Sequence, residues 1–87
     1  MSLDVSTLTR EASAGDIEAQ LQLADLYETG FGVPTDRGQA AYWYRQAAEL
    51  GSAKAQSTLG QMYIRGIGVP EDYSEAVVWL RKAAGQQ

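Results

Sequence analysis

The heptapeptide GFGVPTD at residues 30–36 returns, nearly unchanged, as GIGVPED at residues 66–72. A shift of 36 residues aligns much more of the chain than this heptapeptide. The matching pairs include Gly15 with Gly51, Gln20 with Gln56, Leu23 with Leu59, Tyr27 with Tyr63, Ala40 with Ala76, Trp43 with Trp79 and Arg45 with Arg81. A fixed period of this length is typical of proteins built from stacked structural repeats. The sequence therefore predicts two full repeats.

Apolar residues recur with helical spacing before and after each heptapeptide. The spacing predicts helices over residues 16–29 and 52–65, which we name the A helices, and over residues 37–50 and the matching carboxyl-terminal stretch, which we name the B helices. Residues 3–14 align with the second half of a repeat and predict an N-terminal capping helix. The predicted fold is all-α, with antiparallel helix pairs stacked into a solenoid. We expect a single domain over residues 1–87, with the capping helix at 3–14 and the repeats at 15–50 and 51–86.

Capping residues mark the same boundaries. Asp16 and Ser52 can accept a backbone N–H at the start of an A helix, and each follows a glycine suited to ending the preceding helix. Asp36 and Asp72 each precede Gln or Glu by three residues, the spacing of a capping box, and predict the starts of the B helices. The heptapeptide is then a connector between the two helices of a repeat, in which Val33 or Val69 can fill the space under the turn.

A glycine-rich segment that leads into a helix is also a typical phosphate site, because free N–H groups point at the ligand. In this chain an aspartate stands at that helix end, where its carboxylate takes up the N–H groups and repels an anion. The Lys-Ser or Lys-Thr pair of a P-loop is absent. These differences favour a structural turn over a nucleotide-binding loop.

The aromatic and acidic residues could serve either a binding or catalytic site or the fold alone. Trp43, Trp79, Tyr27 and Tyr63 could stack on bases or sugars, but their places in the apolar stripes favour core packing. Carboxylates at Glu18, Asp25 and Glu28 point away from the apolar stripe of the first A helix. They favour a solvated face over an acid-base pair, because the sequence offers them no partner base.

The composition excludes several classes of function. The chain has 87 residues, no cysteine and no histidine, so it lacks thiolate nucleophiles, imidazole bases and the usual zinc ligands. A net charge of −4 disfavours nucleic acid as a partner, since that affinity comes mainly from neutralising phosphates. No apolar run approaches the roughly 20 residues that cross a bilayer, so we expect no membrane insertion. We expect no cofactor and no enzymatic activity. The compartment is unknown: the cytoplasm is the default, and the periplasm applies if a signal peptide was removed.

The 36-residue unit resembles the Sel-one-like repeat (SLR) family, a relative of the tetratricopeptide repeat. The resemblance rests on AQLQLADLYETGFGVPTD followed by QAAYWYRQAAELG, and it extends from Asp16 to Ala84. An ordinary tetratricopeptide repeat has a period of about 34 residues, with its proline near the end of the second helix. This chain instead has a period of 36 residues and a proline between the two helices of each repeat, which favours the Sel-one-like pattern. The resemblance implies an α-α superhelix, a right-handed solenoid of antiparallel helix pairs, that acts as an adaptor between other proteins.

Two surfaces are candidates for contacts with partners. We expect a protein or peptide partner to bind on the sides of the A helices opposite their apolar stripes, at Glu18, Gln22, Asp25, Thr29, Lys54, Thr58, Gln61 and Arg65. The alternative is a structural fragment that forms a homo-oligomer through its carboxyl-terminal helix, at Val77, Val78 and Leu80. An enzyme ranks third, because no nucleophile, base or metal-ligand set is present.

Overall fold

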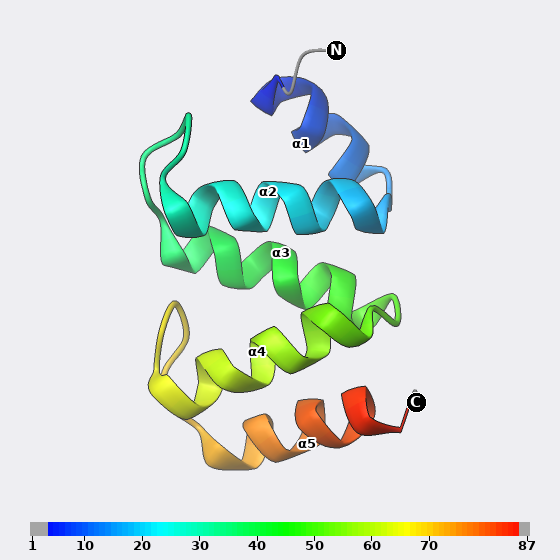
Figure 1. Ribbon diagram of the computed structural model, residues 1–87, viewed down its shortest axis with the longest axis vertical. Coiled ribbons are helices and arrows are strands. Elements are labelled where there is room, and N and C mark those ends of the chain that lie inside the picture. The colour runs from blue at the N-terminus through cyan, green and yellow to red at the C-terminus, as the bar shows by residue number, and fades with distance from the viewer. Residues whose placement is uncertain (1–3, 86–87) are drawn as a thin grey trace.

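The computed structural model describes residues 4–85, which form five α-helices. The helices are α1 (Val5–Ser13), α2 (Ile17–Thr29), α3 (Arg37–Glu49), α4 (Ala53–Arg65) and α5 (Tyr73–Ala84). They are stacked in chain order, and successive helices run in opposite directions (Figure 1). The described residues hold no strand, and the all-α solenoid that the sequence predicts is confirmed.

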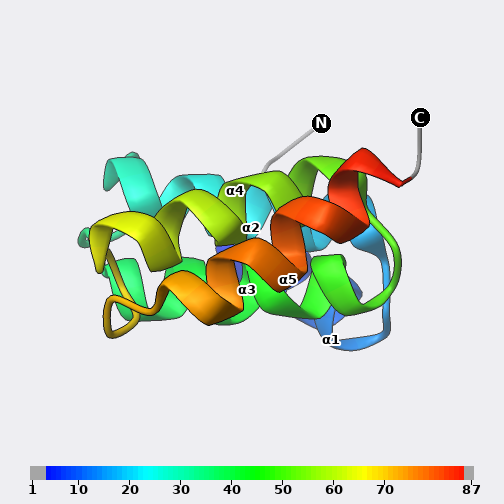
Figure 2. The ribbon, with the colours of Figure 1, turned by 90° about the horizontal axis from the view of Figure 1, so that it is seen from below.

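The stack has two layers. Seen from below, the A helices α2 and α4 lie along one side of the molecule, and the helices α1 and α3 lie along the other (Figure 2). The stack measures 38 × 25 × 16 Å, with α1 at one end of its long axis and α5 at the other (Figure 1). Each inner helix is therefore covered by its neighbours on both sides, whereas α1 and α5 each have an outer face.

The caps expected from the sequence are formed. Asp16 accepts the N–H of Ala19 at 3.2 Å, and the Ser52 hydroxyl accepts that of Ala55 at 3.1 Å. Asp36 accepts the N–H of Gln39 at 3.1 Å, and Asp72 makes the same bond one repeat later.

The reciprocal half of the predicted capping box is replaced by a backbone bond. The N–H of Asp36 donates to the carbonyl of Tyr27 at 2.8 Å, and the N–H of Asp72 donates to Tyr63 at 2.9 Å. These bonds already satisfy the amide that a capping-box side chain would reach, and they tie each B helix to the A helix before it.

The second connector lies against the start of α3. A Cβ atom added at Gly68, where φ is +76°, would meet the carbonyl oxygen of Arg37 and lie 3.2 Å from the Ala41 Cβ. Val69 packs against the core beside Ile67, as the sequence predicts for the valine under the turn. In the first connector Val33 is half-buried and Phe31 is 78% exposed. The two copies of the heptapeptide therefore differ in how much they contribute to the core.

The predicted aromatic core is present. Trp43 and Trp79 are 8% and 5% exposed, and Leu23 and Leu59 are fully buried. Ala84, at the end of α5, is exposed. In the first repeat the same position, Ala48, is covered by the following A helix, and no described helix follows α5.

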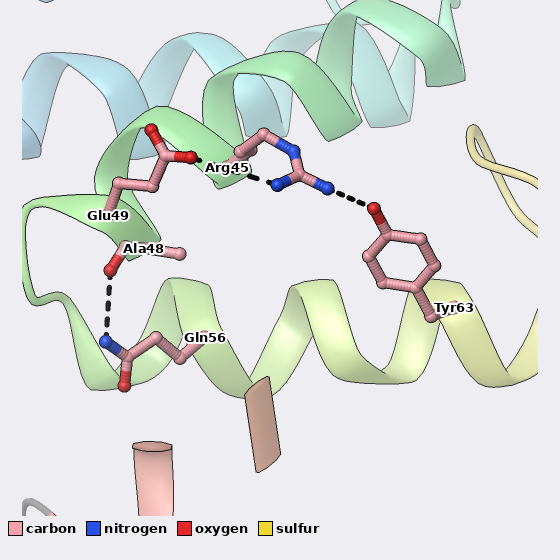
Figure 3. Close-up of polar contacts among 5 residues, drawn as sticks. All are labelled: Arg45, Ala48, Glu49, Gln56 and Tyr63. Atoms are coloured by element: carbon pink, nitrogen blue, oxygen red, sulfur yellow. Dashed lines mark hydrogen bonds and ion pairs between the residues drawn. The ribbon is translucent and has the colours of Figure 1, made fainter. Parts of the chain in front are cut away.

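Buried polar side chains join one repeat to the next. Gln56 donates its side-chain amide to the carbonyl of Ala48 at 3.0 Å (Figure 3). Gln20 makes the same bond to Ala12 at 2.9 Å. Arg45 of α3 donates to the hydroxyl of Tyr63 on α4 and lies 3.8 Å from Glu49 (Figure 3). Its guanidinium also lies 5.8 Å from the ring centroid of Trp79 on α5. The first repeat is thus held to both helices of the second.

Candidate functional site

The A-helix face, the surface at which we expected a partner, contains the predicted side chains of α2 and α4. Within each helix they follow one another at intervals of three or four residues, so they form one stripe on that helix. All of them are exposed except Thr58, which is half-buried: Glu18, Gln22, Asp25 and Thr29 on α2, and Lys54, Thr58, Gln61 and Arg65 on α4.

Only some of these residues line a cleft of about 80 Å³ on this face. Thr58, Gln61 and Arg65 line it from α4, and Met62 and Ile67 add apolar surface. Glu28 lines it from α2. The predicted residues Glu18, Gln22, Asp25, Thr29 and Lys54 do not line the cleft. The cleft is therefore a place where side chains of both repeats could contact one partner group.

Glu28 was assigned to a solvated face from the sequence, and the structure gives it a larger role. Its carboxylate accepts a hydrogen bond from the buried Tyr44 hydroxyl at 3.2 Å. The bond spans 16 residues, so no local pattern could have indicated it. It holds the Glu28 side chain between α2 and α3, at the edge of the cleft.

The environment of Tyr44 raises the pKa of its hydroxyl well above the ordinary tyrosine value. Burial is the largest cause, followed by the negative charges of Glu28 and Asp25 and by the hydrogen bond to Glu28. Each of these disfavours the phenolate. Tyr44 therefore remains a hydrogen-bond donor to Glu28 at neutral pH.

Thr29 is less available than its exposure indicates. Its hydroxyl donates to the carbonyl of Asp25 at 3.0 Å and accepts the N–H of Phe31 at 3.3 Å. These bonds help to end α2 and to start the connector.

The predicted self-association residues separate into two groups. Val77 and Val78 are each 46% exposed on α5. Leu80 is half-buried and packs towards α4, since a Cβ atom added at Gly60 would lie 2.7 Å from the Leu80 Cγ. Leu80 thus contributes to the contact between α4 and α5, and the two valines remain accessible.

Residues 4–85 contain no group of three or more aspartates or glutamates placed to hold a metal ion. Over the same stretch, every helix is too short or too polar to span a bilayer.

Comparison with known proteins identifies the repeats. The family model described as Sel1 repeat matches residues 17–52 and 53–87. A search of curated protein sequences found no significant match.

Three solved structures show the same fold over nearly the whole chain. A Sel1 repeat protein from Oxalobacter formigenes is 48% identical, with a TM-score of 0.87 over 91% of this chain and 23% of its own. A protective antigen of uropathogenic Escherichia coli strains with an SLR fold is 38% identical, with a TM-score of 0.90 over 94% of this chain and 18% of its own. Helicobacter pylori cysteine-rich protein B is 27% identical, with a TM-score of 0.88 over 93% of this chain and 61% of its own.

The chain therefore spans less than a quarter of the first two proteins. The resemblance stated from the sequence is confirmed by the family match, which covers both repeats and all of their helices. This chain belongs to the Sel1 repeat family.

Proposed function

We propose that this chain is a non-catalytic protein-protein interaction module that holds a peptide or protein segment on its A-helix face. Sel1 repeats generally bind proteins, and Sel1-repeat proteins are typically non-catalytic scaffolds. The observation that carries the proposal is the cleft between α2 and α4, where Glu28 of the first repeat lies with Thr58, Gln61 and Arg65 of the second. The proposal treats residues 1–87 as one repeat domain, with 3–14 as the cap and 15–50 and 51–86 as the repeats.

The charges on this face indicate how a partner would lie. The α2 side carries Glu18, Asp25 and Glu28, and the α4 side carries Lys54 and Arg65. The sign of the charge therefore changes from α2 to α4, and not along either helix. We expect a segment that crosses the face, with a basic part over α2 and an acidic part over α4. A small apolar side chain between them would contact Met62 and Ile67 in the cleft.

The test begins with peptides selected from a displayed random library against the folded protein. The best binder is then measured against Asp25→Lys and Arg65→Glu. Each reversal should slow association and change its salt dependence, because complementary charge acts mainly on the encounter rate. Glu11→Lys on α1 and Arg81→Glu on α5 are matched controls, since both residues are exposed, belong to other helices and do not line the cleft. Parent affinity in both reversals, with helicity intact, would contradict the proposal.

A second candidate is self-association through α5. The exposed side of this helix carries Tyr73, Val77 and Val78, which are 64%, 46% and 46% exposed. The outer side of α1 at the other end carries the exposed polar residues Ser6, Arg10 and Ser13. A polar end helix is what a solenoid needs to stay soluble. An association of two α5 helices about a two-fold axis is therefore favoured over stacking of α5 on α1.

A further inference from the structure

A second cavity lies on a different part of the molecule from the A-helix face. It has a volume of about 310 Å³ and opens where α1 and α3 end and α2 begins. In Figure 1 these three helix ends lie on the same side of the stack. The residues that matter for its chemistry are Gln20, Tyr42, Trp43, Gln46, Glu49 and Leu50. We name it the α1–α3 groove.

Gln20 forms a buried part of the wall of this groove. The residue is 2% exposed, and its amide nitrogen donates to the carbonyl of Ala12 at 2.9 Å. A carbonyl can only accept, so this bond fixes the orientation of the amide. The Oε1 atom then has no partner among the described residues. This atom has almost no accessible surface, so a ligand in the groove would contact the exposed side chains of its lining instead.

In the second repeat, a cation lies against the tryptophan that is equivalent to Trp43. Trp79 is the equivalent of Trp43, and the Lys82 ammonium lies 4.6 Å from the centroid of its ring. The first repeat has Gln46 in place of this lysine. The neutral amide supplies no cation to Trp43. The chain thus contains one tryptophan with its own cation and an equivalent one without it.

The rest of the groove also suits a positive charge. Glu49 lines it with a side chain that is 54% exposed, and its pairing with Arg45 is loose at 3.8 Å. Tyr42 is 51% exposed and packs edge-on against Trp43, with ring centroids 4.9 Å apart. A cation over an aromatic face is attracted by the negative face of the ring. The groove therefore combines an exposed carboxylate with aromatic surface.

We propose that the α1–α3 groove binds a lysine or arginine side chain of a partner protein, in the place that Lys82 occupies in the second repeat. The cation pairs with the exposed Glu49 carboxylate and lies against Tyr42 and Trp43. A phosphate or carboxylate would be repelled by Glu49. The site is separate from the A-helix face, so it can be tested independently of the proposed function.

The test uses short blocked peptides and the amide and indole NMR signals of the whole chain. The probes are acetyl-Gly-Arg-Gly-amide, acetyl-Gly-Lys-Gly-amide and the neutral analogue acetyl-Gly-citrulline-Gly-amide. We expect both cationic peptides to shift the Trp43 indole and Gln20 side-chain signals in a saturable way, and the citrulline peptide to leave them in place. The Trp79 indole should not move, since Lys82 already covers that ring.

Two variants sharpen the result. Gln46→Lys supplies the missing cation from the chain itself and should abolish peptide binding, with helicity unchanged. Glu49→Gln should weaken binding by about two- to fivefold, the range of an exposed charge pair. Glu11→Gln is the matched control, because this exposed carboxylate does not line the groove. No saturable shift, an equal shift with citrulline, undiminished binding to Gln46→Lys or unchanged affinity in Glu49→Gln would each overturn the proposal.

Discussion

Ala41 and Val77 occupy the same position in successive repeats, yet Ala41 is 3% exposed and Val77 is 46% exposed. Ala41 is covered because the second connector, at Gly68, lies on it. No described segment covers Val77 in this way. Val78 differs, because its equivalent Tyr42 is itself 51% exposed within the stack. Of the two valines, Val77 therefore marks the surface that an additional repeat or a second copy would cover.

This distinction predicts how self-association responds to substitution. Val77→Glu should convert an oligomeric parent to a smaller species in sedimentation at equal concentration, because a carboxylate would be buried in the contact. Val78→Glu, its neighbour with the same exposed fraction, should keep most of the association. A parent that is monomeric at high concentration would contradict the assignment to α5. A larger effect from Val78→Glu would contradict the assignment to the Val77 side of that helix.

The core assignment predicts a large loss of stability from one aromatic residue. Trp79→Ala should lower the free energy of unfolding by about 3–5 kcal/mol, since a buried indole leaves a cavity that the stack cannot fill. Val78→Ala on the same helix is the control, and we expect a change within about 0.5 kcal/mol. Urea denaturation followed by circular dichroism measures both. A midpoint that barely moves for Trp79→Ala would show that this ring is not part of the core.

The two connectors should differ in their tolerance of a side chain. Gly32→Ala should cost about 1–2 kcal/mol, because φ is +84° but no atom lies within 4 Å of the added Cβ. Gly68→Ala should cost clearly more, since its Cβ would also collide with the backbone carbonyl of Arg37. Chemical denaturation of this matched pair is the measurement. Equal losses would mean that the second connector does not pack on α3 as described.

The raised pKa of Tyr44 predicts a stability difference at alkaline pH. Below the ordinary tyrosine pKa of about 10, the hydroxyl is protonated in both the folded and the unfolded chain. As the pH rises above that value, the unfolded chain loses the proton while the folded chain retains it. The folded state therefore loses stability, by at most about 1.4 kcal/mol per pH unit.

Tyr44→Phe removes this contribution. Relative to the parent, the variant should be less stable at pH 7 by about 0.5–1.5 kcal/mol, for the lost bond to Glu28. Its disadvantage should shrink as the pH rises through 10 and 11. Tyr42→Phe is the control, because Tyr42 is exposed. If the stabilities of the parent and Tyr44→Phe changed in parallel with pH, the pKa of Tyr44 would not be raised in the folded state.

The helices and their ends could be predicted because their signals are local and appear twice. Asp36 and Asp72 each cap the helix that follows, and these bonds depend only on residues three positions away. Gly15 and Gly51 adopt the positive φ that their position before an N-cap indicated. Agreement between the two copies made each prediction stronger than either copy alone.

The contacts between repeats could not be predicted, because they depend on what lies beside each helix. Ile67 packs on the core and its equivalent Phe31 is 78% exposed, although the two heptapeptides are nearly identical. The bond from Tyr44 to Glu28 joins two helices and depends on how closely they pack. The cleft on the A-helix face follows from such contacts, so the sequence indicated the helix sides involved but not the residues that line it.

The most direct test of the A-helix face is a map of the amide shifts that a selected peptide induces. The account predicts that the largest changes fall on residues 18–29 of α2 and 54–65 of α4, including the cleft residues Glu28, Thr58, Gln61 and Arg65. Changes confined to α3 or α5, with those stretches unaffected, would contradict it.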